Sequence, residues 1–341
     1  MDKKRSPVFR ERAEDYFLIS LVAFGVTVVA IRAFLHFTGY PQVGNDMLHI
    51  AHALWGGLLL FVAVLLPILL TNRWAINASA WLSGIGIGLF IDEVGKFISQ
   101  SNDYFFPPAL SVIYGFFLLN VLVYFYFRRP RKKNPRNALY YSLDDLQEAL
   151  DGDLDTEEAA RIEAHLDIAK QSEHEEISFL AEMIAKYLEE EKDRLLIAKP
   201  NLWRRLVRRV DRYGRTIGQR KHRIIILGVL ISWIIFVISY IAVMIFGYAS
   251  LSSEFLQWRL VLIIVQSMVG CLMVASIINW VSGHEDRGLK FGIWGILLSL
   301  VILQLISFYT DQILALVSTL IQFVVLLILL SYRRWYPGVI K

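Results

Sequence analysis

Eight apolar stretches of bilayer length run through this chain and leave few folds open to it. A helix needs roughly 20 apolar residues to cross about 30 Å of hydrocarbon. A hydrophobic fraction of 56% also exceeds that of an ordinary soluble protein. We therefore predict an all-α fold: a polytopic membrane protein with eight transmembrane helices. The predicted spans are residues 16–37, 47–70, 78–98, 107–127, 224–248, 256–281, 289–308 and 312–332.

Two parts of this topology have alternative interpretations. Only Tyr309, Thr310 and Asp311 separate the last two stretches, so a single fused and kinked helix is the alternative there. The first stretch is followed by no small-residue cleavage site, and we expect it to remain as a spanning helix rather than a signal peptide.

Lysine and arginine fall on one side of the predicted topology. They occupy the N-terminal segment, the loop at Arg73, the 128–136 run and the C-terminal end. Loops that face cytoplasm carry an excess of these residues, so we expect both termini to be cytoplasmic. The opposite loops contain no lysine or arginine: 38–46, 99–106, 249–255 and 309–311.

A polar insertion divides the spans into two groups of four. We expect a four-helix membrane unit at 1–128, an acidic helical module at 142–198, a basic interfacial helix at 199–223 and a second four-helix unit at 224–341. The acidic module holds 18 of the 31 acidic residues of the chain. Its apolar spacing predicts helices at 144–150, 156–170 and 173–197, with Thr156 as an N-cap.

The basic segment 199–223 reverses the charge, with ten lysines and arginines against Asp211 alone. Trp203, Leu206, Val207 and Val210 share one side of a helix, which predicts that it lies on the inner leaflet against anionic lipids. Proximity to the next span explains the charge without nucleic-acid binding. Docking of the acidic module onto this segment would compete with lipid, and a separate protein partner of the acidic module is the alternative.

Ionisable residues gather near the outer ends of the first three spans. Such groups cost several kcal/mol in a bilayer unless they pair or face water, and therefore indicate a functional site. Arg32 and His36 are four residues apart on one helix face, where snorkelling to the headgroups is the simpler interpretation. Asp46, His49 and His52 open the second span, and Asp46 is also suited to be its N-cap.

The third span carries small residues that lead to charged ones. Ala80, Gly84, Gly88, Asp92 and Lys96 recur every four residues, which predicts a smooth stripe that packs closely against another helix. Glu93 lies about 100° away and needs its own partner, such as Arg32 or a histidine. If Asp92 and Lys96 only neutralise each other, the site interpretation fails.

These residues are predicted to lie at a similar depth in the membrane, which indicates a single site. At about 1.5 Å rise per residue, the charged groups of all three helices lie roughly 5 to 10 Å below the outer surface. Two polar residues of the next outer loop are placed to fold over them. The predicted ligand-binding residues are Arg32, His36, Asp46, His49, His52, Asp92, Glu93, Lys96, Asn102 and Asp103.

These motifs resemble the VanZ-like bacterial membrane proteins over about the first 128 residues. The Asp-x-x-His opening matches Asp46 and His49, and the Asp-Glu pair followed by Asn-Asp matches Asp92–Glu93 and 102–103. Lys96 lies where that family has a glutamine. The resemblance implies a protein of the bacterial cytoplasmic membrane with a role in the cell envelope.

Residues 146–172 resemble the start of an anti-sigma-factor zinc finger. His165-Leu166 matches its His-Leu pair, but Ala169 and Ser172 occupy its cysteine positions. We therefore expect the helical fold without zinc.

Three functions remain open. The first is binding of a lipid or lipid-linked headgroup in an outward-facing pocket, with cationic side chains on phosphate and carboxylates on hydroxyls or amines. The second is an intramembrane metal-dependent hydrolase that uses His49, His52, Asp92 and Glu93. The third, ion or proton transport, is weakened by the apolar inner halves of spans two and three. No cofactor is expected beyond a divalent metal, because nucleotide-binding and haem motifs are absent from the sequence.

Overall fold

The computed structural model describes residues 6–39, 44–45, 48–49, 51–104, 106, 108–128, 134–151, 154, 156–190, 218–246, 253–310 and 312–336. Within these residues, eight helices are long and apolar enough to cross a membrane. The prediction of an all-α, multi-pass membrane protein is therefore confirmed. The strands of the described chain are one antiparallel pair, β1 (Gly44–Asn45) and β2 (Leu48–His49).

The chain forms two compact units, which cut across the boundaries expected from the sequence. The first unit contains Met1–Glu93 and Leu119–Arg205, and the second contains Val94–Leu118 and Leu206–Lys341. The acidic module thus belongs with the first three helices. The fourth span, α5 (Pro108–Phe127), begins in one unit and ends in the other.

In the first unit, α3 (Arg73–Asp92) packs against both α1 (Ala13–Thr38) and α2 (His52–Leu69). The short strands lie between α1 and α2, and α2 begins at His52 rather than near residue 47. Its N-cap is Ala51, so the expected capping role of Asp46 was wrong. Asp46 itself lies outside the described residues.

Glycines set the spacing of these three helices. A Cβ on Gly84 would overlap the carbonyl oxygen of Ser20 in α1, and one on Gly88 would stand 2.7 Å from the Cβ of Thr27. On the other side of α3, a Cβ on Gly86 would meet the carbonyl oxygen of Gly56 in α2 at 2.8 Å. The small-residue stripe predicted on α3 is therefore a helix contact, and a second glycine contact faces α2.

Replacing Gly84 by alanine is expected to destabilise the first unit by about 1–3 kcal/mol, because the added methyl meets backbone that cannot move aside easily. Denaturant unfolding of the detergent-solubilised protein measures this. Gly57→Ala on α2 is the matched control, since a Cβ there meets no atom within 4 Å. Equal stability of the two variants would show that α1 and α3 do not pack this closely.

The insertion folds as a three-helix module of α6 (Pro135–Asp151), α7 (Thr156–Lys170) and α8 (Glu175–Glu190). The bounds of α7 match the prediction. The first helix of the module begins nine residues earlier than expected, where the side chain of Asn134 accepts a hydrogen bond from the amide of Arg136 at 2.9 Å. The core is formed by Leu154, Ile162, Leu166, Ala169, Ala181, Ile184 and Leu188, among others.

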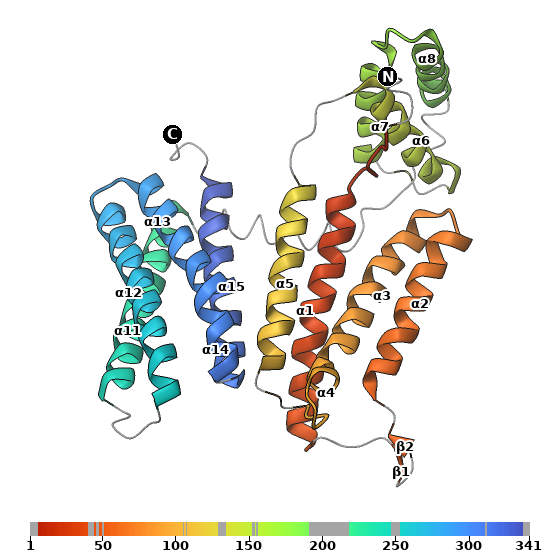
Figure 1. Cartoon of the computed structure of the whole chain (residues 1–341). Helices are drawn as coiled ribbons and strands as arrows, with labels where there is room; N and C mark the ends of the chain where they lie inside the picture. Colours follow the sequence, from red (N-terminus) through yellow and green to blue (C-terminus); the bar gives the residue numbers. More distant parts are fainter. Residues whose placement is uncertain are drawn as a thin grey trace. The chain divides into compact units, whose positions relative to one another are not determined.

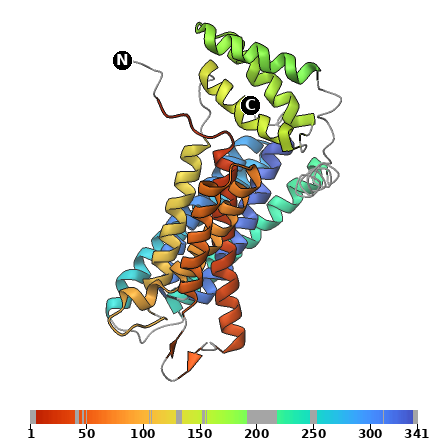
Figure 2. The same ribbon diagram turned by 90° about the vertical axis from the view of Figure 1, so that its right-hand side faces the viewer.

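The module lies beyond the end of the helices at which α2 turns into α3 (Figure 1). The view at 90° shows the same placement (Figure 2). Two predicted segments lie outside the described residues: the C-terminal end of the third helix of the module, 191–197, and most of the basic segment, 199–217.

The second unit begins with α4 (Val94–Ile98) and the first half of α5. Its remaining spans are α11 (Gln219–Phe246), α12 (Ser253–Val281), α13 (Glu285–Leu298) continued by α14 (Gln304–Thr310), and α15 (Gln312–Trp335).

A π-helical turn, η2 (Ser299–Leu303), joins α13 and α14 within the seventh span. Its Leu300 carbonyl accepts a hydrogen bond from the Tyr114 hydroxyl of α5 at 2.8 Å. Helices α14 and α15 are separate and pack on each other, as the two-helix interpretation predicted.

Candidate functional site

A buried carboxylate, Asp92, ends α3 and is the centre of the site. The glycine contacts along α3 bring this end of the helix against α1, where Arg32 projects toward it. Arg32 Nε donates a hydrogen bond to Asp92 Oδ1 at 2.6 Å, and its Nη2 donates to the Asp92 carbonyl oxygen at 3.4 Å. The guanidinium therefore pairs with the side chain and also satisfies a carbonyl at the negative end of the helix dipole.

His52, the first residue of α2, joins a second carboxylate to the first. Its Nε2 lies 3.2 Å from Asp92 Oδ2, and its Nδ1 lies 3.2 Å from Glu93 Oε1. An ionised carboxylate only accepts hydrogen bonds, so two ionised partners require a ring that donates from both nitrogens. That form of the ring, with Arg32, balances the two carboxylates. We call Arg32, His52, Asp92 and Glu93 the charge cluster.

The two acids of the charge cluster are more deeply buried than its two bases. The exposed fraction of the side chain is 0% for Asp92 and 2% for Glu93, against 11% for Arg32 and 19% for His52. Arg32 and His52 are therefore the less buried members of the cluster, and the two carboxylates are enclosed.

A break in the third span explains why Glu93 can join the cluster. The sequence predicted one helix over 78–98, but α3 ends at Asp92, and Glu93 has φ −87° and ψ 7° before α4 begins. Gly95 follows, and a Cβ there would stand 2.9 Å from the carbonyl oxygens of Asp103 and Tyr104. The packing of these carbonyls on Gly95 and the bond from Arg32 to the end of α3 both fit a chain that turns here.

Of the other predicted site residues, the structure describes the surroundings of four. His36 is exposed, with its ring 5.7 Å from that of Phe37. Lys96 lies over the ring of Tyr104 at 5.7 Å, Asn102 is exposed with φ 52°, and the Asp103 amide donates to Ser99 Oγ at 2.6 Å.

Lys96, Asn102 and Asp103 belong to the second unit. Asp46 is outside the described residues, and His49 is described only as part of β2, without its side chain. The contacts described here join four of the ten predicted residues, which are those of the charge cluster.

The expected metal ligands include three members of the charge cluster. Both ring nitrogens of His52 face carboxylates, and the Arg32 guanidinium already neutralises Asp92. A metal needs a ring nitrogen lone pair and unneutralised carboxylate oxygens. The donor set therefore suits ion pairing better than metal coordination.

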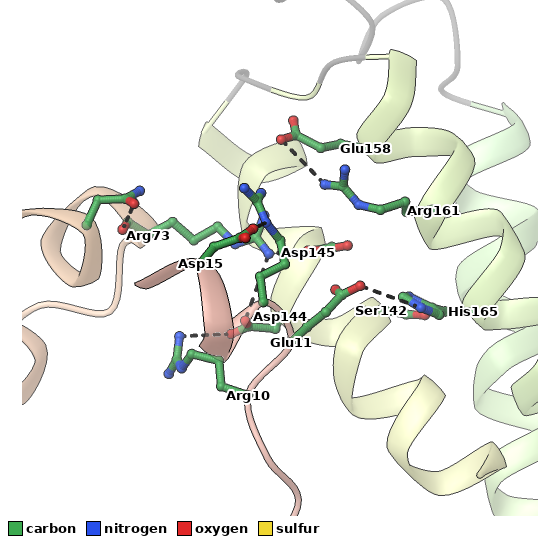
Figure 3. A network of polar contacts seen from close by, with 12 residues as sticks. Arg10, Glu11, Asp15, Arg73, Ser142, Asp144, Asp145, Glu158, Arg161 and His165 are labelled. Atoms are coloured by element: carbon green, nitrogen blue, oxygen red, sulfur yellow. Dashed lines mark hydrogen bonds and ion pairs between the residues drawn. The ribbon is translucent and has the colours of Figure 1, made fainter. Parts of the chain in front are cut away.

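A second polar network, which the sequence patterns do not predict, joins the module to the helices (Figure 3). Arg73, the first residue of α3, donates to Asp145 of α6; Arg73 is 6% exposed and Asp145 0%. Arg10 Nη1 lies 3.6 Å from Asp144 Oδ1, and Glu11 Oε1 lies 3.5 Å from His165 Nε2. Arg73 had been assigned only to the basic side of the topology.

Within this network, single ligand atoms of Glu11, Asp145 and His165 all lie within 4.8 Å of one another. Such a trio has donors that suit a metal ion, but Asp145 is already paired with Arg73. The network therefore acts as a clamp that holds the N-terminal segment, α3 and the module together.

Stability of this clamp is expected to fall as pH rises. Burial, and after it the Asp145 carboxylate, raise the pKa of Glu11 from 4.5 to about 7, against the opposing charges of Arg161 and Arg73. Between these two pH values the folded protein holds a proton on Glu11 that the unfolded chain has lost, so the contribution of Glu11 to stability is fully present below pH 4.5 and is lost as the pH rises to about 7. Glu11→Gln should flatten this dependence in thermal unfolding of the solubilised protein. Asp167→Asn, at an exposed position of α7, should leave it unchanged; a flat profile for the native protein would contradict the prediction.

The fold and the charge cluster define the class: an all-α, multi-pass membrane protein whose first three helices enclose paired charges. Comparison of the chain with protein-family models, with curated proteins and with solved structures gave no match in any of the three. Its function is therefore inferred from its own residues.

Proposed function

We propose that this protein binds a lipid or lipid-linked headgroup through the charge cluster at the outward-facing ends of α1, α2 and α3. The proposal places it in the bacterial cytoplasmic membrane with both termini in the cytoplasm. The one-sided distribution of lysine and arginine supports this orientation. In that orientation, the cluster lies near the outer surface and the module lies in the cytoplasm.

The observation that carries the proposal is the difference in burial within the cluster. Arg32 and His52 keep some exposed surface, while Asp92 and Glu93, which contact them, are buried. An arginine fork matches the geometry of a phosphate, and an imidazole N–H adds a second donor. A headgroup phosphate would replace the carboxylates as the acceptor of hydrogen bonds from Arg32 and His52. The carboxylates would then accept hydrogen bonds from hydroxyl or amine groups of the same headgroup.

The resemblance to VanZ-like proteins gives further support for an envelope role. It rests on short motifs, of which Asp92 and Glu93 contribute to the cluster. A metal-dependent hydrolase stays the alternative hypothesis, and metal analysis of the purified protein tests it.

Binding of phosphatidylglycerol and of a polyprenyl phosphate, measured by native mass spectrometry, tests the proposal. Arg32→Gln should weaken binding by about tenfold or more, since a charge-assisted hydrogen bond contributes about 1.5–3 kcal/mol. Arg32→Lys keeps the charge but loses the fork, and should give an intermediate loss if Arg32 contacts phosphate.

His36→Gln is the matched control, because His36 lies one turn further along α1 and is exposed. It should bind as the native protein does. Unchanged binding by a folded Arg32→Gln protein, or an equal loss in His36→Gln, would contradict a site at the charge cluster.

A further inference from the structure

Three polar side chains inside the spans of the second unit are buried and carry an oxygen atom that has no hydrogen-bond partner within the described chain. Gln266 of α12 is 1% exposed, Ser299 at the start of η2 is 0% exposed, and Gln322 of α15 is 1% exposed. The unpaired atoms are Oε1 of both glutamines and Oγ of the serine. Buried polar atoms are normally paired, so these three oxygens indicate a ligand.

Comparable groups in the same helices are paired. The hydroxyls of Ser267, Ser307 and Thr319 each donate to the backbone carbonyl four residues earlier, at 2.7, 2.9 and 2.7 Å. The side-chain amide of Gln304 donates to Ser318 Oγ at 2.8 Å. A serine in a spanning helix thus commonly bonds to its own backbone, and the hydroxyl at the start of η2 does not.

The antiparallel packing of α13 and α15 places Ser299 opposite Gln322. A Cβ on Gly292 of α13 would stand 3.5 Å from Leu329 Cδ1 of α15, so these two positions face each other. Ser299 follows Gly292 by about two turns, and Gln322 precedes Leu329 by about two turns, which returns both to the facing sides. The bond that Gln304 makes to α15 fits the same register.

Helix α12 brings Gln266 to the same region. A Cβ on Gly295 of α13 would stand 2.9 Å from Met273 Cε of α12, and Gln266 precedes Met273 by about two turns on the same side of that helix. Its neighbour Val265 shares a core cluster with Leu303, the last residue of η2. The three oxygens therefore border one region, where α12, η2 and α15 meet.

The chemistry of this region suits a cation of low charge. Residues 260–281, 291–309 and 312–332 contain no Asp, Glu, Lys, Arg or His. Divalent ions such as Ca²⁺ and Mg²⁺ are bound with carboxylates, whereas membrane proteins bind Na⁺ and K⁺ through neutral oxygens at breaks in spanning helices. The π-helical turn at η2 is an irregularity of this kind, and such turns are frequent at functional sites.

We propose that Gln266, Ser299 and Gln322 bind a monovalent metal cation, Na⁺ or K⁺, within the second unit. The two amide oxygens and the hydroxyl oxygen coordinate it, and water completes its coordination. Because the cation pairs oxygens that are unpaired without it, it stabilises the folded protein. The inference does not depend on the headgroup proposal, which concerns residues of the first unit.

Thermal unfolding of the solubilised full-length protein tests the proposal in sodium, potassium and choline chloride at equal ionic strength. Choline is too large for these oxygens to surround. Sodium or potassium at about ten times its Kd should raise the Tm by roughly 2–4 °C over choline, and the salt that does so identifies the ion. Binding of the radioactive ion should saturate at a single ion per chain.

Ser299→Ala and Gln322→Leu should each weaken binding of the ion by about tenfold or more and remove the difference in Tm between the salts. Neither variant breaks a hydrogen bond within the described chain, so the Tm in choline chloride should not fall. Ser267→Ala is the matched control, because Ser267 is exposed and bonded to its own helix. It should keep the response of the native protein.

Two results would overturn the proposal. Equal Tm values of the native protein in the three salts, without binding of the radioactive ion, would show that these oxygens pair with water alone. A response to the ion that persists in both Ser299→Ala and Gln322→Leu, or that is lost equally in Ser267→Ala, would place the ion elsewhere.

Discussion

Replacing Asp92 by asparagine is expected to lower the free energy of unfolding by about 3–5 kcal/mol, because the pair of Arg32 with a fully buried carboxylate is then lost. Asparagine has nearly the same shape, so the loss reports charge rather than a cavity. Denaturant unfolding in detergent, followed by tryptophan fluorescence, measures the change.

Two further variants separate pairing from general damage at this site. The double variant Arg32→Gln with Asp92→Asn removes both charges and should be less destabilised than the sum of the single variants. Asp286→Asn, in a helix-surface pair with Lys290, should cost at most about 1 kcal/mol. Additive single and double variants would contradict a direct Arg32–Asp92 pair.

Replacing Arg73 by glutamine should be comparably severe, at about 3–5 kcal/mol, because Asp145 would stay buried beside Glu11 without a cation bonded to it. We expect the module to loosen from the helices before it unfolds, since its own core does not include Arg73. Hydrogen exchange should therefore increase first in the N-terminal segment and along α6.

Arg10→Gln is the matched control for this clamp. Its contact with Asp144 joins side chains that are 45% and 23% exposed, and exposed pairs contribute about 0.2–1 kcal/mol. Exchange in α6 that rises equally in both variants would show that the clamp does not depend on the buried pair.

Much of the charge cluster could be predicted because a bilayer penalises isolated charge. Arg32, His52, Asp92 and Glu93 stood out as ionisable groups within apolar stretches, and the Gly84–Gly88 stripe indicated which face of the third span packs. The alternative pairing of Asp92 with Lys96 was also open, because i and i+4 residues are neighbours on a helix. The structure shows Arg32 and His52 bonded to Asp92, and a helix that ends there.

The clamp could not be predicted in the same way. Arg73 lies at a predicted cytoplasmic loop, where the orientation of the chain in the membrane is enough to explain a basic residue. Asp145 is one of many acidic residues in the module. Nothing in the local pattern distinguishes a buried aspartate from a solvated one on an amphipathic helix. The acidic composition of the module predicts a separate domain, and this prediction specifies no contact with the helices.

The sequence by itself determined the number of membrane spans within the described chain and their approximate positions, because hydrophobic length and spacing are local properties of one segment. It also determined which ionisable groups need partners. Only the tertiary structure decided which partners they take, where α3 breaks, and that the module belongs with the first three helices. Those outcomes depend on contacts between residues far apart in the chain, such as Arg32 with Asp92 and Arg73 with Asp145, which no local pattern specifies.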